Sequence, residues 1–424
     1  MPLRHDHRKL GADFVTLPQM TGRRVGMPFV LSTPTLALLF RQNNGPTPSG
    51  DYQPSRSLSM AGSDSIIYFY QDKGCIVRDK KKMPMKEPPE ESIKSVQYDL
   101  FTQFLSNNKN DVSNMVEVWE SIPKYFFTPR QISQLRTEGG LAEPYKWNFS
   151  YNDSPCTVKI QPALIEQENG KYKAFFPSVT EELVEEALKK IFTDQQFGIH
   201  NPQKTESWVR FTLGMIQKEL KNRGRSRDKK QIKHAIEVMS SCVITLYKEK
   251  KEIWKGSILQ DLVSVNRHDY LADTSSQHIA RLPLFISHSV NTLEYRQFNY
   301  ERLMSCNEQL TRWIYKQLIN RFKQANLMNT YHFMYSKVYR DSGLLQQKTE
   351  DKNRQKLRSS LTELIERGVI ANFTEDIRKK GRKIVDVKYT VSPTTNFVSE
   401  QKAANKRCKD GKTKALSVGI QIDS

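Results

Sequence analysis

The sequence predicts an α+β protein with two tandem winged-helix domains, each a helix-turn-helix followed by a β-hairpin wing, preceded by a small mixed α/β region and flanked by disordered termini. Two observations support this fold class. A basic helix followed by two apolar strands around a charged turn occurs between residues 218 and 259 and again between residues 349 and 391. The formal net charge of +20 favours a polyanionic partner, and nucleic acid is the commonest one.

Length and composition divide the chain into regions. At 424 residues it is long enough for two or three domains that each bury a core. We expect a largely disordered region at 1–95, a small mixed α/β domain at 96–177, a first winged-helix domain at 178–300, a second at 301–392, and a basic disordered tail at 393–424.

Hydropathy and cysteine usage narrow the class of protein. No apolar run approaches the ~18 residues of a membrane-spanning helix, and the N-terminus lacks the apolar core of a signal peptide. The cysteines are scattered without a C-x-x-C pair, which predicts reduced thiols in a cytoplasmic protein, without a zinc site or a disulfide framework. They are Cys75, Cys156, Cys242, Cys306 and Cys408.

The N-terminal region offers little apolar material for a core. Gly, Pro, Ser, Asn and Gln dominate from Ser32 to Ser63, and the run from Arg78 to Pro89 is charged and Pro-rich. One apolar patch, Ile66 to Tyr70, is either a docking strand or an adhesive segment.

Cap and turn signals mark the small mixed domain. Thr128 is an N-cap before Pro129 at the first helical position, and Gly139-Gly140 ends that helix. Asn169-Gly170 lies between two apolar runs, which is the pattern of a tight β-hairpin. We expect further strands at 145–149 and 157–160.

The first winged-helix domain opens at a capping box formed by Ser178 and Glu181. A second helix is predicted over Trp208–Leu220, and the third, basic helix starts at the capping box of Asp228 and Gln231. The buried face of this third helix consists of Ile232, Ala235, Ile236 and Met239. Strands are expected at 242–247, 253–259, 257–265 and 278–288.

The second winged-helix domain repeats this order. Its first helix carries Leu310, Ile314, Leu318 and Phe322 on one face, and residues 331–339 fit either a strand or a helix. A helix from Thr349 to Gly368 then precedes a strand, a basic tip and a second strand that ends near Val391. Two such modules in one chain are hard to attribute to chance charge runs.

The basic side chains of the two modules are the candidate DNA contacts. Phosphate contacts would position the protein, and the few side chains that reach base edges would specify sequence. For any single lysine, a solubilising surface is the alternative. In the first module the candidates are Lys229, Lys230, Lys233 and His234 on the helix, with Arg225 and Arg227 gripping phosphates. In the second they are Arg354, Lys356 and Arg358 on the helix, with Arg378, Lys379, Lys380, Arg382 and Lys383 in the wing.

No catalytic or metal-binding pattern stands on a convincing scaffold. His5-Asp6-His7 lies in the charged N-terminal region, and His278 and His288 lie at opposite ends of a predicted strand, too far apart for one metal ion. Gly411-Lys412-Thr413 resembles the end of a P-loop, but no apolar strand precedes it. We therefore expect a non-enzymatic protein without a metal or cofactor.

Several segments of the chain resemble a known family. They include VEVWESIPKYFFTPRQ (116–131), FFPSVTEELVEEALKKIF (175–192), the stretch 258–306, and LTRWIYKQLINRF (310–322). These segments are similar to the corresponding segments of iteron-type plasmid replication initiators, the TrfA-like Rep proteins. The similarity spans roughly residues 115–391, and the long Pro- and Ser-rich N-terminal region departs from the family.

The resemblance implies a function as well as a fold. Such a protein would bind direct repeats at a replication origin, help to melt neighbouring A·T-rich DNA, recruit the host helicase machinery in the bacterial cytoplasm, and exchange between a homodimer and a DNA-binding monomer. It would also be able to repress its own gene. Two other functions fit the same modules: a winged-helix transcriptional regulator without initiator activity, and a rolling-circle nicking relaxase with a degenerate motif.

Overall fold

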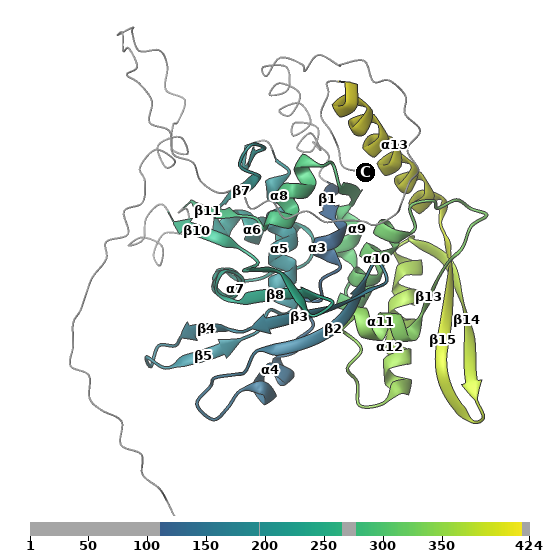
Figure 1. The fold of residues 1–424 in the computed structure, drawn as a ribbon, viewed down its shortest axis with the longest axis horizontal. Coiled ribbons are helices and arrows are strands. Elements are labelled where there is room, and N and C mark those ends of the chain that lie inside the picture. Colours follow the sequence, from purple (N-terminus) through teal and green to yellow (C-terminus); the bar gives the residue numbers. More distant parts are fainter. Residues whose placement is uncertain (1–110, 195, 265–276, 418–424) are drawn as a thin grey trace, which may run out of the picture. The chain divides into compact units, whose positions relative to one another are not determined.

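The computed structural model describes residues 111–194, 196–264 and 277–417 (Figure 1). All of these residues belong to a compact unit that begins at Lys82. The predictions for the disordered region 1–95, the patch at 66–70, the histidines at 5–7 and Cys75 lie outside the described residues.

The fold mixes α-helices and β-strands, as the sequence predicts, and short strands alternate with helices in the first half of the described chain. In chain order the elements of this half are β1 (Val112–Val116), α3 (Glu117–Glu120), α4 (Pro129–Leu135), β2 (Tyr145–Tyr151), β3 (Ser154–Gln161), β4 (Ala163–Glu166), β5 (Tyr172–Phe175), α5 (Val179–Phe192), β6 (Gly198–Asn201), β7 (Glu206–Phe211), α6 (Leu213–Asn222), α7 (Lys229–Ser241), β8 (Val243–Lys248), β9 (Lys251–Gly256) and β10 (Gln260–Ser264).

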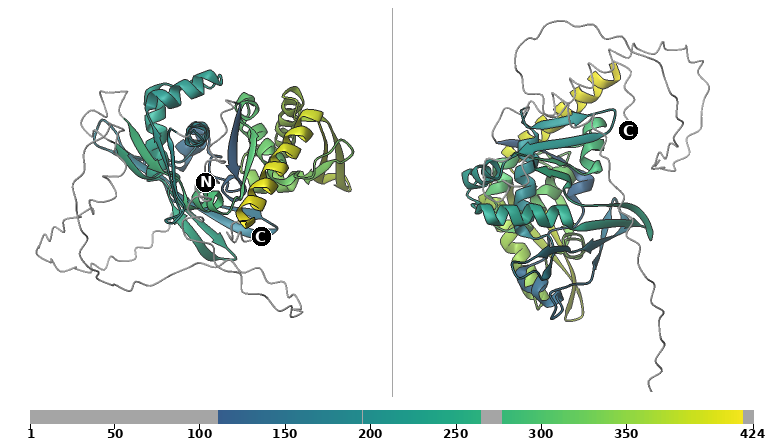
Figure 2. Two further views of the ribbon diagram at one scale, coloured as in Figure 1. Left: turned by 90° about the horizontal axis from the view of Figure 1, so that it is seen from above. Right: turned by 90° about the vertical axis from the view of Figure 1, so that its left-hand side faces the viewer.

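Helices are longer in the second half, and the long hairpin β14–β15 leads into the helix α13, which is drawn in yellow in Figure 2 against the green C-terminal elements. The elements are β11 (His278–Arg281), α8 (Leu284–Asn291), β12 (Tyr295–Asn299), α9 (Tyr300–Ser305), α10 (Gln309–Arg321), β13 (Tyr331–Met334), α11 (Tyr335–Ser342), α12 (Glu350–Glu366), β14 (Ile370–Lys380), β15 (Lys383–Pro393) and α13 (Thr395–Ser417).

Antiparallel pairing gathers the strands into small sheets. The order β2-β3-β8-β9 forms one four-stranded sheet and β10-β11-β7-β6 forms another, while β13-β15-β14 form a three-stranded sheet. The strands β4 and β5 make a hairpin, and β1 pairs with the distant β12, where Val112 lies opposite Asn299. Pairings between strands so far apart in the sequence cannot be predicted from the local hydrophobic periodicity.

Three helices start where the sequence predicts them, because side chains of the first turn or its cap accept hydrogen bonds from backbone N–H groups there. Thr128 Oγ1 accepts a hydrogen bond from Gln131 N at 3.3 Å, and Asp228 Oδ1 accepts one from Gln231 N at 2.7 Å. At the start of α5, Ser178 N donates to the Glu181 carboxylate at 2.7 Å.

The predicted helix over Trp208–Leu220 is wrong in its first part. Residues 206–211 form the strand β7, which pairs with β6 and β11, and only Leu213–Asn222 is helical. Thr212 separates the two elements, since its Oγ1 caps α6 by accepting a hydrogen bond from Met215 N at 3.1 Å. Val209 therefore belongs to a strand, and its helical spacing from Leu213 is a coincidence.

The predicted strand over 278–288 is also wrong in part, because it ends at Arg281 and is followed by the helix α8. Pro283 stands between them with φ −56°, a value that suits a helix start and interrupts strand pairing. The strand expected at 257–265 is shorter and covers Gln260–Ser264. Residues 331–339, which fitted a strand or a helix, contain both β13 and the start of α11.

The disordered tail predicted for 393–424 is wrong over residues 395–417, which form α13. Phe397 and Val398 are buried, so the first turn of this helix is anchored in the core. Arg296 on β12 adds a polar anchor, because its guanidinium donates to Asn405 Oδ1 at 2.8 Å and to the Gln401 side chain. The segment is polar overall, so its composition predicted disorder although these few contacts hold the helix in place.

One sheet crosses a predicted domain boundary. β3 comes from the region 96–177 and pairs with β8 from the region 178–300, with Val158 opposite Leu246. The boundary predicted between these two regions therefore cuts through one hydrogen-bonded sheet.

A buried cluster of charges joins the two modules. Its acidic members come from α3 and α5, and two of its cations come from α10, the first long helix of the second module. The members are Glu120, Lys124, Glu182, Glu185, Glu186, Lys189, Arg312 and Lys316, and each is at most 6% exposed. Four carboxylates face four cations, so the cluster carries no formal net charge.

Short ion pairs connect the cluster from helix to helix. Lys316 Nζ lies 2.7 Å from Glu120 Oε2 and 2.5 Å from Glu186 Oε1. Lys189 Nζ bridges the same two carboxylates at 2.5 and 2.6 Å. Arg312 Nη2 lies 2.8 Å from Glu182 Oε2. These contacts tie α10 to α5 along one continuous network.

The network keeps the Glu120 carboxyl ionised. Burial by itself raises the pKa of the Glu120 carboxyl, but Lys189 and Lys316 outweigh burial and hold this pKa well below its usual range. The folded-state pKa is therefore depressed. The contribution of Glu120 to stability is present above the unfolded pKa near 4.5 and is lost only as the pH falls toward the lower folded value.

Replacing Lys316 with Met should lower the free energy of unfolding by about 3–5 kcal/mol, because two buried carboxylates lose a partner. Urea denaturation followed by circular dichroism measures this change. The matched control is Lys323→Met, which removes a half-exposed lysine paired with Glu117 at 2.9 Å and should cost less than about 1 kcal/mol. Equal losses in the two variants would contradict a structural role for the cluster.

Candidate nucleic-acid interface

The tip of the hairpin β14–β15 gathers exposed positive charge. β14 and β15 pair up to Lys380 opposite Lys383, and Gly381 enters the two-residue turn with φ +61°, a conformation that favours glycine. All five predicted wing residues are exposed, and none forms an ion pair within the described residues: Arg378, Lys379, Lys380, Arg382 and Lys383. The tip can therefore offer its full charge to a phosphate backbone.

The predicted basic residues of α12 lie elsewhere. Lys356 Nζ donates to the Leu344 carbonyl oxygen at 3.0 Å, and burial lowers the pKa of this lysine. Arg354 pairs with Asp351 one turn earlier and its side chain is only 11% exposed. Lys356 and Arg354 thus serve the local structure of the module.

Arg358 occupies an intermediate position. Its guanidinium forms two parallel hydrogen bonds with the Glu375 carboxylate on β14, at 2.7 and 2.9 Å. These hydrogen bonds raise the pKa of Arg358 further above its ordinary value. A bidentate pair of this kind fixes the hairpin against α12 and neutralises the charge that the sequence assigned to DNA.

The exposed face of α12 carries different side chains. Leu357, Leu361 and Leu364 are fully buried, so the opposite side of the helix faces solvent. That side presents Lys352, Gln355, Ser359 and Thr362 at helical spacing. Gln can contact adenine through two hydrogen bonds, and Lys and Ser can reach other base edges. Sequence reasoning missed these residues because it selected positive charge rather than the positions opposite the leucine stripe.

The first module presents a mixed helix face. Lys230 is exposed at the start of α7, while Lys229 and Lys233 are half-buried. His234 is turned away toward the protein, since its ring meets the Phe175 ring edge-on at a centroid distance of 4.5 Å. Of the predicted helix residues, Lys230 is the one whose exposure fits a DNA contact best.

The two arginines before α7 have separate environments. Arg225 Nε donates to the Met304 carbonyl oxygen at 2.8 Å, and Nη1 donates to Asn307 Oδ1 at 3.1 Å. Burial lowers the pKa of this guanidinium. Arg225 therefore ties the approach to α7 to the junction of α9 and α10, and its phosphate role is not supported by its position. Arg227 is half-buried and donates to the Ser226 carbonyl oxygen at 2.8 Å.

The hairpin β8–β9 is the counterpart of the second wing. Glu249 and Lys250 form its turn with φ +51° and +69°. Lys248, Lys250, Lys251 and Lys255 are exposed on it, but Glu249 and Glu252 are exposed among them. This hairpin thus has less net positive charge than the tip of β14–β15.

One arrangement has the connectivity of a catalytic triad. His200 Nδ1 lies 2.9 Å from Ser207 Oγ, and His200 Nε2 lies 2.7 Å from Asn291 Oδ1. Ser207 is fully buried on β7, so no substrate could reach its hydroxyl. These contacts tie α8 to the β6–β7 hairpin. Among the described residues, no group of three or more His, Cys, Asp or Glu side chains could hold a metal ion.

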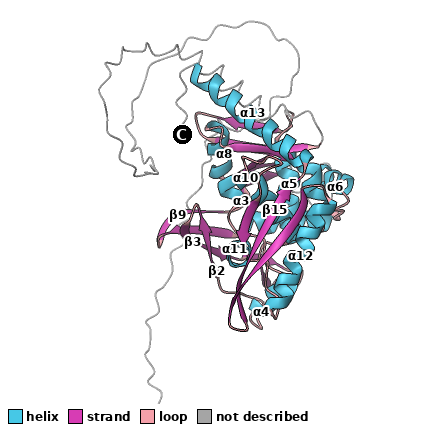
Figure 3. Ribbon diagram, turned by 90° about the vertical axis from the view of Figure 1, so that its right-hand side faces the viewer, coloured by secondary structure: helices cyan, strands magenta, loops and turns pink. Residues whose placement is uncertain are grey.

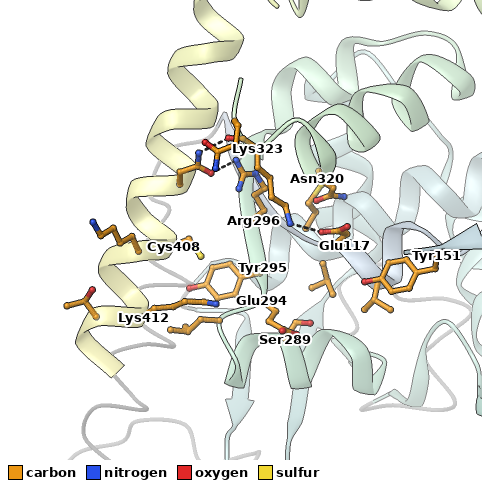
Figure 4. A pocket seen from close by; sticks show the side chains of 18 of the residues that line it. Glu117, Tyr151, Ser289, Glu294, Tyr295, Arg296, Asn320, Lys323, Cys408 and Lys412 are labelled. Atoms are coloured by element: carbon orange, nitrogen blue, oxygen red, sulfur yellow. Dashed lines mark hydrogen bonds and ion pairs between the residues drawn. The ribbon is translucent and has the colours of Figure 1, made fainter. Parts of the chain in front are cut away.

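A cavity of about 590 Å³ lies between α13 and the β1–β12 pair (Figure 4). Lys323 and Glu117 pair at its wall, and Arg296 reaches across to α13. The Nδ2 atom of buried Asn320 has no hydrogen-bond partner within the described residues. Lys412 and Thr413, the residues of the P-loop-like triplet, lie on the helix α13 and not on a phosphate-binding loop.

In the part of the chain that the structure describes, every helix is too short or too polar to cross a membrane.

Comparison with known proteins finds similarity to solved structures only. No protein-family model and no curated protein matches the sequence. Similar solved structures include two of domains 2 and 3 of RctB, at 13% and 11% identity with TM-scores of 0.40 and 0.38, which cover 65% and 64% of this chain and 98% and 97% of those chains. Another is the Pi initiator protein in complex with iteron DNA, at 11% identity with a TM-score of 0.31, covering 51% of this chain and 91% of that chain.

The environments of the basic residues predict different salt responses. Replacing all five wing residues, 378–380, 382 and 383, with Ala should flatten the dependence of log affinity on log salt by roughly 0.9 for each phosphate that the variant no longer neutralises. Lys356→Ala removes a charge that is bonded inside the protein, so the slope should stay unchanged. Fluorescence anisotropy with a mixed-sequence duplex measures both. A slope change in Lys356→Ala as large as that of one wing residue would contradict this assignment.

Proposed function

We propose that this chain is a replication initiator, a sequence-specific double-stranded DNA-binding protein that recognises direct repeats through two tandem winged-helix modules. The observation that carries the proposal is the pairing of an exposed polar face on α12 with a neighbouring hairpin whose tip holds five basic side chains without ion pairs in the described residues. One element can read base edges while the other grips the backbone.

The second module has more exposed side chains suited to contact base edges than the first module has. α11 and α12 correspond to the helix-turn-helix, and β13-β15-β14 correspond to the sheet and wing. In the major groove, α12 would place Lys352, Gln355 and Ser359 toward base edges. The bidentate pair between Arg358 and Glu375 supports this role, because it holds the wing at a fixed angle to the reading helix.

The first module follows the same order with an extra strand pair. α5 is followed by β6 and β7, then by α6 and α7, and then by the hairpin β8–β9. Here α7 would enter a second major groove, with Lys230 as its most exposed cation. The buried charge cluster between α5 and α10 supports a fixed spacing of the two reading helices, which recognition of a repeat of defined length requires.

The finer parts of the proposal follow the sequence resemblance. They are local melting of A·T-rich DNA, recruitment of the host helicase, repression of its own gene, and an equilibrium between a homodimer and a DNA-binding monomer in the bacterial cytoplasm. The protein would act without catalysis, since its role is to position other proteins and DNA.

Replacing Gln355 with Ala should reduce discrimination at a single base pair of the recognised sequence by about 1–3 kcal/mol, because Ala cannot form the two hydrogen bonds to the base edge. Affinity for unrelated DNA should change little. Competition binding with duplexes that differ at one position measures the effect. The matched control is Glu366→Ala at the far end of the same helix face, which should leave base preference intact. A uniform loss for all duplexes would remove Gln355 from the reading surface.

The experiment that tests the function is a footprint of the purified full chain on the DNA flanking its own gene, at near-physiological salt with excess competitor DNA. Protection over direct repeats about one or two helical turns apart is the expected result. Protection of a single promoter palindrome would favour a transcriptional regulator, and an origin-dependent helicase-loading assay then separates the two. Absence of any sequence-specific protection would overturn the proposal.

A further inference from the structure

We infer that α4 is a third DNA-contacting element, whose exposed Arg130 binds a phosphate of the duplex between the two reading helices. This inference rests on the proposed function, and it adds a residue that lies outside both winged-helix modules. α4 contains only Pro129–Leu135, so the argument depends on what its side chains touch and on where its free face points.

One flank of α4 is fixed to the second module. Gln131 Nε2 donates a hydrogen bond to Gln346 Oε1, in the loop that leads into α12. The segment before α4 is held in the same direction, because Gln309 Nε2 on α10 donates to the Tyr125 carbonyl oxygen at 2.6 Å. α4 therefore keeps a constant position relative to the start of the reading helix α12.

The other flank of α4 faces the first module. Ile132 and Arg136 line a cavity of about 270 Å³ together with Gln231 and His234 of α7. Arg136 is fixed there, since its Nε donates to the Ala174 carbonyl oxygen at 2.6 Å and its guanidinium lies 4.6 Å from the centre of the Phe175 ring. α4 thus contacts the loop that leads into α12 on one flank and shares a cavity with α7 on the other.

The remaining face of α4 is open and polar. Arg130, Ser133 and Gln134 are exposed, while Ile132 on the opposite side is buried. Arg130 forms no ion pair within the described residues, in contrast to Arg358. Lys348 and Lys352 are exposed in the chain that follows Gln346, so the Gln131–Gln346 contact joins the segment of Arg130 to a segment with two further exposed cations.

The position of α4 suits a contact with a bound duplex. In Figures 1 and 3, α4, α12 and the tip of β14–β15 lie toward the same end of the described unit. Two helices that occupy successive major grooves lie about 34 Å apart along the DNA, and the minor groove with its two phosphate rows faces the protein between them. α4, which contacts the loop before α12 and shares a cavity with α7, is placed to contact those phosphates.

The test compares Arg130→Gln with the parent chain, because Gln removes the charge and keeps the helix propensity. Binding of the full chain to a mixed-sequence duplex of about 30 base pairs is measured as a function of salt. We expect the slope of log affinity against log salt to fall by roughly 0.9, and affinity to fall about five- to tenfold near 0.1 M salt. Arg130→Lys should keep the slope, since it keeps the charge.

The matched control is Lys402→Ala, which removes one exposed charge from α13, at the base of the hairpin β14–β15 and away from its tip. This variant should bind like the parent. A parental slope for Arg130→Gln, beside a reduced slope for the variant that lacks the five wing charges, would overturn the role of α4 and leave the proposed function standing. Parental slopes in both variants would overturn the proposed function together with this inference.

Discussion

The buried charge cluster between α5 and α10 is the constraint on which the arrangement of the two modules depends. Lys316 and Lys189 share the carboxylates of Glu120 and Glu186, so neither helix can turn or slide without separating several short ion pairs. Charges buried in this way gain little net free energy compared with apolar side chains of equal size, but they tolerate far fewer geometries. We regard the cluster as a device that sets the angle between the modules more than one that adds stability.

The basic residues fall into two groups: those that form hydrogen bonds with the protein, and those that are exposed to solvent at the tip of β14–β15. Arg225, Lys356 and Arg358 form hydrogen bonds with other groups of the protein and hold loops and the second wing in place. The cations at the tip of β14–β15 project into solvent without ion-pair partners in the described residues. A rigid body with charge at its edges suits a long, regular polyanion, because the phosphates of a duplex recur at constant spacing.

Much of the local structure could be read from the chain. The capping residues Thr128, Ser178 and Asp228 start their helices, and the turn at Asn169-Gly170 joins two strands, because these signals act between residues a few positions apart. The error at 208–211 arose where apolar residues fit two periods at once, and only the strand partner β11, far along the chain, decided between them. At 282–288 the strand gives way to α8 because Pro283 stands at the start of that helix. The helix α13 escaped prediction because its docking depends on Arg296, which lies about a hundred residues earlier.

In the candidate DNA-binding site, too, some features follow from the sequence and others depend on the tertiary structure. The sequence by itself determined the positive charge, the two repeats of helix and hairpin, and the wing tip, since a turn between two strands must be exposed wherever the hairpin lies. Only the tertiary structure decided which cations are available on α7 and α12, and that α4 contacts the loop before α12 and shares a cavity with α7. The sequence does not show whether a lysine or arginine donates its hydrogen bonds to the protein or to water. Lys356, for example, donates to the Leu344 carbonyl oxygen, and only the folded chain brings these two groups together.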